Sequence, residues 1–150
     1  MTSIFVDTNV LVYRYDLTET RKQRVAEEWL TALWKTRAGR ISTQILQELY
    51  VTLTRKLSRG LRTGEARTIV QALEAWTPLP IEPSLIREAW RIEDRHQISF
   101  WDALVVAAAL RSGSTILLTE DLQDGMEVGS LRVLDPFSTD RTGTETIHDS

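Results

Sequence analysis

The chain has 150 residues, 42% of them hydrophobic and 26% charged, with a formal net charge of −3. This length predicts one domain with its own core. The small net charge provides no overall attraction to nucleic acid. The absence of cysteine excludes disulfides and thiolate metal sites. The N-terminus lacks the features of a signal peptide, and the longest strongly apolar run is too short to span a bilayer, so we expect a cytoplasmic protein without membrane contact.

The first half of the chain predicts two strands and three helices. SIFV is typical of a short buried strand that ends before Asp7. TQILQELYVTLTRKL has one apolar stripe at helical spacing and predicts an amphipathic helix. The other elements predicted here are a helix from about Thr20 to Thr36, a strand around Ile41 and a helix from Thr63 to Ala75.

The second half continues the alternation of strands and helices. LPIE is a candidate strand, and Pro83 suits the first turn of a helix that runs to about His96. A nearly all-apolar helix follows from Ser99 to Ser112, where Gly113 stops it. STILLT and LRVL are the last two candidate strands.

This alternation predicts an α/β protein, three-layered α/β/α with a central, mostly parallel sheet. Ligands of such sheets bind beyond the carboxyl ends of the strands. Asp7 follows one apolar strand and Asp121 lies just after another, so we expect both carboxylates at the same edge of the sheet.

Each acid of interest also has a purely structural explanation. Asp102 is the third helical residue after Ser99, a capping-box position, yet its helix is one that the core would enclose. Asp7 would be a good N-cap for TNVLVY, and Asp121 lies in a turn-forming stretch, TEDLQDG. Glu48 lies just off the apolar stripe of its helix, where a solvated glutamate is common.

As an ordered set, these stretches resemble the PIN domain family and, within it, the VapC-type toxin nucleases of toxin–antitoxin pairs. The resemblance spans about Ile4 to Phe137 and is carried by IFVDTNVLVY, ILQELYVTL, ISFWDALVVAAAL and ILLTEDLQDG. It implies a PIN domain over residues 1–137, and we expect residues 138–150 to form a polar, disordered tail. The family's catalytic and metal-binding acids carry over to Asp7, Glu48, Asp102 and Asp121.

Three further polar residues belong to this expectation. Asn9 and Thr119 match positions that family members keep around the metal site. Asp124 is a departure, because many PIN domains have phenylalanine there, and its carboxylate could join the site or lie in solvent.

The resemblance implies cleavage of RNA phosphodiester bonds with Mg²⁺ or Mn²⁺ as cofactor and a metal-activated water as nucleophile. Hard divalent cations prefer oxygen ligands, and two carboxylates 4 Å apart repel each other by about 4 kcal/mol at an effective dielectric constant near 20. Four converging acids therefore need a cation or a proton. Metal-free catalysis has poor candidates, since the only histidines are His96, at a predicted helix end, and His148 in the tail.

Basic side chains after the Glu48 helix are candidates for RNA phosphate contacts, although a solvated helix end would look the same. They are Arg55, Lys56, Arg59 and Arg62. Trp101 beside Asp102 suggests base stacking, but core packing is the commoner role of tryptophan, and we expect it there. Trp29, Trp34, Trp76 and Trp90 are expected in the core or an interface.

Partners follow from the resemblance: an RNA substrate, a cognate antitoxin protein and a second copy of the chain in a homodimer. Other classes fit less well. A haloacid-dehalogenase-type phosphatase needs D-x-D where this chain has Asp7-Thr8-Asn9, and a receiver domain needs a late lysine, which the second half lacks. A PIN-like module that binds RNA or protein without cutting remains the alternative.

Overall fold

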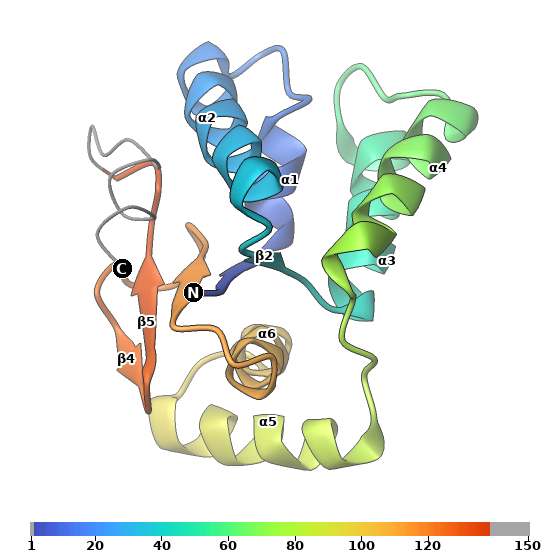
Figure 1. The fold of residues 1–150 in the computed structure, drawn as a ribbon. Coiled ribbons are helices and arrows are strands. Elements are labelled where there is room, and N and C mark those ends of the chain that lie inside the picture. The colour runs from blue at the N-terminus through green and yellow to red at the C-terminus, as the bar shows by residue number, and fades with distance from the viewer. Residues whose placement is uncertain (1, 139–150) are drawn as a thin grey trace.

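A five-stranded, mostly parallel sheet forms the centre of the computed structural model, which describes residues 2–138 (Figure 1). The strand order is β2-β1-β3-β5-β4, and only the pairing of β4 with β5 is antiparallel. This confirms the predicted fold class. The strands are β1 (Ile4–Val6), β2 (Gly39–Arg40), β3 (Ile116–Leu118), β4 (Glu127–Val128) and β5 (Leu131–Leu134).

Helices cover both faces of this sheet. In Figure 1, α5 lies below α6 at one side of the molecule, while α1 with α2 and α3 with α4 occupy the other. A π-helical turn continues α3, and a 3₁₀ turn ends α4. The helical segments are α1 (Thr8–Tyr13), α2 (Thr20–Thr36), α3 (Thr43–Val51), η1 (Thr52–Lys56), α4 (Thr63–Ala72), η2 (Leu73–Trp76), α5 (Pro83–His96) and α6 (Phe100–Arg111).

The central strands are apolar because helices cover both of their faces. All three residues of β1 are fully buried. In the parallel register, Phe5 is opposite Leu117, which is itself opposite Val133. The backbone amide of Asp7 donates to the carbonyl of Leu118 at 3.0 Å, so the polar residues that follow β1 and β3 lie next to each other.

Helix α6 is the central helix of the core. Its residues from Ala103 to Ala109 are all buried, as expected for a helix that is apolar nearly all round. Gly113, with a φ of 77°, ends this segment as predicted. Asp102 precedes the buried run and is half-buried in the first turn, so the helix carries an anion only where it leaves the core.

Two sequence expectations were wrong or incomplete. LPIE is not a strand: Leu79 alone forms a bridge, with Ser42, because it lies between Pro78 and Pro80, which have no amide hydrogen to donate. The hairpin of β4 and β5 was not predicted, although Gly129-Ser130 between two apolar residues is a two-residue hairpin signal.

The tryptophans divide between the core and the surface. Trp29 and Trp76 are buried as expected, whereas Trp34 and Trp90 are exposed. The expected core position of Trp101 is wrong, because the side chain is 64% exposed. It stands at the first turn of α6, ahead of the residues that the core encloses.

The domain boundary at residue 137 remains a prediction. The expected disordered tail, including His148, lies outside the described residues apart from Ser138. Within residues 2–138, no helix has both the length and the apolar character needed to cross a membrane.

Candidate functional site

Four acids from four different elements lie near one another beyond the carboxyl ends of β1 and β3. Asp7 follows β1 and caps α1, Glu48 is on α3, and Asp102 is in the first turn of α6. Asp121 follows β3. Electrostatic repulsion raises the pKa values of Asp7, Glu48 and Asp102: Asp7 is repelled by Glu48 and Asp121, and Glu48 and Asp102 are each repelled by Asp121. The fold thus brings the sequence-predicted acids together.

Asp7 is the most deeply buried of these acids. Its side chain accepts hydrogen bonds from the backbone amide of Thr8 at 2.8 Å and from the hydroxyl of Thr119 at 2.7 Å. Burial raises its pKa from 3.8 to about 7 despite these bonds, and repulsion from Asp121 and Glu48 adds to the rise. Asp7 is therefore both the predicted N-cap and a carboxyl group held close to its titration point at neutral pH.

Asn9 joins the two acids that follow the strands. Its Nδ2 donates to Asp7 Oδ2 at 3.3 Å and to Asp121 Oδ2 at 3.1 Å, and it also reaches Thr119 Oγ1 at 3.1 Å. Thr119 Oγ1 in turn accepts from the amide of Asp121 at 3.1 Å. Asn9 and Thr119 thus lie among the acids, and a neutral amide stands between two carboxylates.

Glu48 and Asp102 form the outer part of the cluster. Glu48 is exposed and accepts a hydrogen bond from the hydroxyl of Thr8 at 3.3 Å. Desolvation, followed by repulsion from neighbouring acids, raises the pKa of both carboxyl groups. The hydroxyl of Ser99 accepts from the Asp102 amide at 3.1 Å, so the capping explanation of this residue holds alongside its place in the cluster.

Three residues that sequence reasoning missed hold the loop between Thr119 and Asp121. The Tyr13 hydroxyl donates to Glu120 Oε1 at 2.6 Å, and Lys22 Nζ lies 2.9 Å from Glu120 Oε2. Lys22 Nζ also lies 4.7 Å from the centre of the Tyr13 ring. The one sequence signal that could have suggested this role is that Glu120 directly precedes Asp121.

Asp124 has a structural contact of its own. Its Oδ1 accepts from the backbone amide of Asp135 at 3.0 Å and so ties the turn after β3 to the end of β5. The half-buried side chain therefore has a structural role in this turn.

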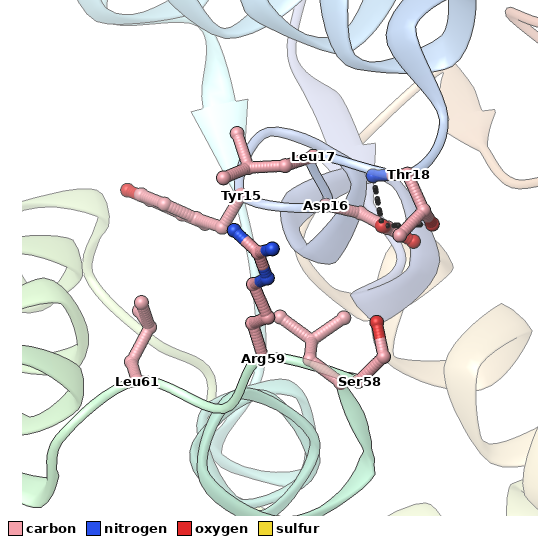
Figure 2. Close-up of a pocket in the computed structure, with 8 residues that line it drawn as sticks. Tyr15, Asp16, Leu17, Thr18, Ser58, Arg59 and Leu61 are labelled. Carbon is pink, nitrogen blue, oxygen red and sulfur yellow. Dashed lines mark hydrogen bonds between the residues drawn. The ribbon is translucent and has the colours of Figure 1, made fainter.

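Two cavities lie on the α1 side, and the first of them adjoins the cluster. One, of about 270 Å³, is lined by Thr8, Asn9, Tyr13 and Thr52, among others. It shares Asp16 with a second cavity of about 300 Å³, in which the Arg59 side chain extends toward Tyr15 (Figure 2). Arg59 thus lines a cavity that meets, at Asp16, the cavity beside Thr8 and Asn9.

The other predicted RNA-binding residues lie on the same segment of the chain. Lys56 is near enough to Glu48 to lower its pKa against the effect of burial. Arg55 is the other basic residue at the end of η1, and Arg62 immediately precedes α4. All four basic residues therefore follow α3, on the segment that leads away from the acids.

The four acids have the right kind of ligand atom for a hard divalent cation, but they are not arranged around one. All four acids offer oxygen ligands, and the ion pairs formed within residues 2–138 include none of them. Yet no group of three or more His, Asp or Glu side chains in this part of the chain is arranged to hold a metal ion. The chemistry of the four acids thus suits a divalent cation, while their arrangement in this structure does not form a ready-made metal site.

Comparison with known proteins gives a family and a fold. The model of the PIN domain family matches residues 4–123. A toxin–antitoxin complex from Klebsiella pneumoniae contains a similar chain, with a TM-score of 0.66 and 18% identity over 92% of this chain and 100% of that one. VapC20 of Mycobacterium tuberculosis, a sarcin-ricin loop cleaving toxin, has a TM-score of 0.57 and 24% identity over 77% of this chain and 87% of its own. No curated protein matches the sequence.

Proposed function

This chain belongs to the PIN domain family, and we propose that it is a metal-dependent endoribonuclease, the toxin of a type II toxin–antitoxin pair. The observation that carries the proposal is the gathering of four carboxylates, one of which, Asp7, desolvation leaves with a pKa of about 7. A charge cluster of this kind is costly for folding unless a ligand compensates it. The presence of such a cluster at the edge of the sheet supports a binding role.

Asp7, Glu48, Asp102 and Asp121 would hold the ion. When bound, Mg²⁺ or Mn²⁺ would neutralise the carboxylates, activate a water and stabilise negative charge on the phosphate. Thr119 and the Thr8 amide hold the Asp7 carboxylate in place through their hydrogen bonds. Asn9 Nδ2 sets the separation of Asp7 from Asp121.

RNA would pass the acids with its backbone toward the basic segment after α3. Lys56 acts on the charge of Glu48, and Arg59 lines a hollow that adjoins Thr8 and Asn9 through Asp16. Arg55 and Arg62 extend the same segment. Such side chains position a nucleic acid through its phosphates without reading its sequence.

The proposed partners are an antitoxin and a second copy of the chain. A toxin–antitoxin complex among the similar structures supports the first, and the exposed Trp34 and Trp90 on α2 and α5 are compatible with the second. A small DNA-binding protein encoded beside this chain is the expected antitoxin, and a lone gene would argue against the toxin role.

Asp102→Asn tests the nuclease proposal. The substitution removes one negative charge from the cluster but keeps the side-chain shape and the Ser99 cap, so we expect cleavage of RNA with Mn²⁺ to fall at least 100-fold while the far-UV circular dichroism is unchanged. The matched control is Asp94→Asn, because Asp94 is an exposed acid on α5, and it should cleave like the wild type. Cleavage by Asp102→Asn at the wild-type rate would refute the assignment.

A second candidate function is a PIN-like module that binds RNA or protein without cutting. The observation that favours it is that, in the described part of the chain, no three acids are arranged to hold a metal. This module would leave RNA intact with either Mn²⁺ or Mg²⁺, and EDTA would have no effect on its RNA affinity.

A further inference from the structure

The most exposed large aromatic ring of the described residues belongs to the residue that directly precedes Asp102. Trp101 is 64% exposed, although from Ala103 to Ala109 its own helix is completely buried. Exposing an indole in water forgoes the free energy of burying it, about 25 cal/mol for each Å² of apolar surface. Core packing therefore does not account for the position of this side chain.

The location of Trp101 is fixed by its neighbours on two helices. Its Cα is about 3.8 Å from that of Asp102, since the two residues are consecutive. Its backbone carbonyl accepts from Gln44 Nε2 at 3.5 Å, and Gln44 and Glu48 lie one turn apart on the same face of α3. Trp101 thus stands where the helices that carry Glu48 and Asp102 meet.

The ring is also held in place while remaining accessible. Phe100 packs against it edge to face, with ring centres 5.2 Å apart and an angle of 70° between the planes. Such a contact restricts the rotation of the indole, and the exposure of the side chain leaves apolar ring surface open to solvent. An open aromatic surface is what a stacked base needs.

We propose that Trp101 is a stacking site for a base of single-stranded RNA, next to the phosphate that the acids engage. This inference rests on the proposed nuclease function and assigns one subsite of it. A phosphate at the cluster brings the base of an adjoining nucleotide within reach of the ring. Stacking tolerates any base because every base has a π-face, so Trp101 would fix the strand rather than select a sequence.

Abasic oligonucleotides test stacking directly. The probes are fluorescent single-stranded RNAs that lack one base at successive positions, with Ca²⁺ in place of Mn²⁺ to prevent cleavage. We expect Trp101→Ala to weaken binding of the intact RNA about 5- to 150-fold, the range measured for loss of one stacked base. One abasic position should weaken wild-type binding similarly and leave Trp101→Ala binding almost unchanged.

Two further variants complete the experiment. Trp101→Phe should retain part of the affinity, and Trp90→Ala, which removes an exposed indole from α5, should bind like the wild type. Stacking is overturned if Trp101→Ala binds intact RNA normally, or if it loses affinity but stays as sensitive to every missing base as the wild type.

The two proposals fail in different ways. If Mn²⁺ stabilises the wild type and RNA is cleaved, but Trp101→Ala binds normally, the stacking site alone is wrong. If the wild type neither cleaves RNA nor gains stability from Mn²⁺, the nuclease proposal is wrong, and the stacking site is overturned with it.

Discussion

Asp7 shows how one residue combines a structural and a chemical role. Its side chain caps α1 through the Thr8 amide, yet water is excluded from it more completely than from the other three acids. A hydrogen bond from a neutral group recovers only part of the hydration that a carboxylate loses on burial. The cap thus fixes where the charge is, and the burial makes that charge expensive.

This cost predicts a pH-dependent stability for the metal-free protein. Folding raises the pKa of Asp7 from 3.8 to about 7, so the folded chain binds a proton that the unfolded chain has released. The contribution of Asp7 to stability is complete below about pH 4 and is lost as the pH rises through about 7. Between pH 5 and pH 8 the loss is about 3 kcal/mol.

Asp7→Asn isolates this contribution from those of other groups. Urea unfolding in EDTA should show the wild type losing stability from pH 5 to pH 8 relative to the variant. Parallel pH profiles for the two proteins would mean that Asp7 ionises normally in the folded state.

At the scale of elements, α2 fixes the loop that carries Asp121. Lys22 of α2 pairs with Glu120 at 2.9 Å, and both side chains are less than one-third exposed. Tyr13 of α1 donates to the same carboxylate. Two helices on one side of the sheet therefore determine where the loop after β3 lies. Tyr13 and Lys22 do so through Glu120 and do not bond to Asp121 itself.

Lys22→Met tests this positioning role. The substitution leaves Glu120 without its cation, so the loop should shift and weaken Mn²⁺ affinity about 10-fold, as loss of outer partners commonly does at metal sites. Isothermal titration with Mn²⁺ provides the measurement. Lys35→Met, an exposed position at the end of the same helix, is the control, and equal Mn²⁺ affinities for both variants would rule out the role.

Gly39 of β2 is required by the close approach of a ring. A Cβ atom at this position would lie 2.7 Å from Trp76, which is buried. We expect Gly39→Ala to lower the free energy of unfolding by about 1–3 kcal/mol, the usual cost of overpacking. Gly64→Ala is the matched control: no heavy atom lies within 4 Å of its Cβ position, and because it lies in α4, alanine should stabilise it by up to about 1 kcal/mol. Chemical denaturation compares the two.

The elements were predictable where local pattern and burial agree. The bounds of α2 and α5 follow from apolar spacing and from Pro83, and β1 and β3 from their apolar runs. LPIE misled because Leu79 and Ile81 suit a strand but Pro78 and Pro80 on either side of Leu79 do not. The π-helical turn η1 keeps the apolar stripe of α3 but changes its hydrogen-bond pattern. The hydrophobic pattern of a segment indicates which of its faces is buried, but it does not indicate which backbone hydrogen bonds the segment forms.

The site was predictable only in part. The sheet rule places Asp7 and Asp121 together without any other knowledge. Glu48 needed the family resemblance, because an exposed glutamate on an amphipathic helix carries no local signal. The position of Trp101 could not be predicted, since its exposure depends on where α6 enters the core.

At the scale of the whole molecule, the acidic cluster couples stability to cation binding. If the four acids bind Mn²⁺ only in the folded state, a free concentration of 100 times the Kd stabilises the protein by about 2.7 kcal/mol. For a chain of this size, that corresponds to a rise in Tm of about 5–10 °C. Differential scanning fluorimetry with Mn²⁺ measures the rise, EDTA should reverse it, and a constant Tm would contradict cation binding.

The sheet also limits how copies of this chain can associate. Its outermost strands, β2 and β4, have only two residues each. Just after β2, the backbone of Leu79 already bonds to Ile41 and Thr43. Edge strands this short expose few backbone amides and carbonyls with which a strand of another molecule could pair. Pairing of edge strands is therefore an unfavourable route to a dimer, and side chains on the helices offer the larger surface for association.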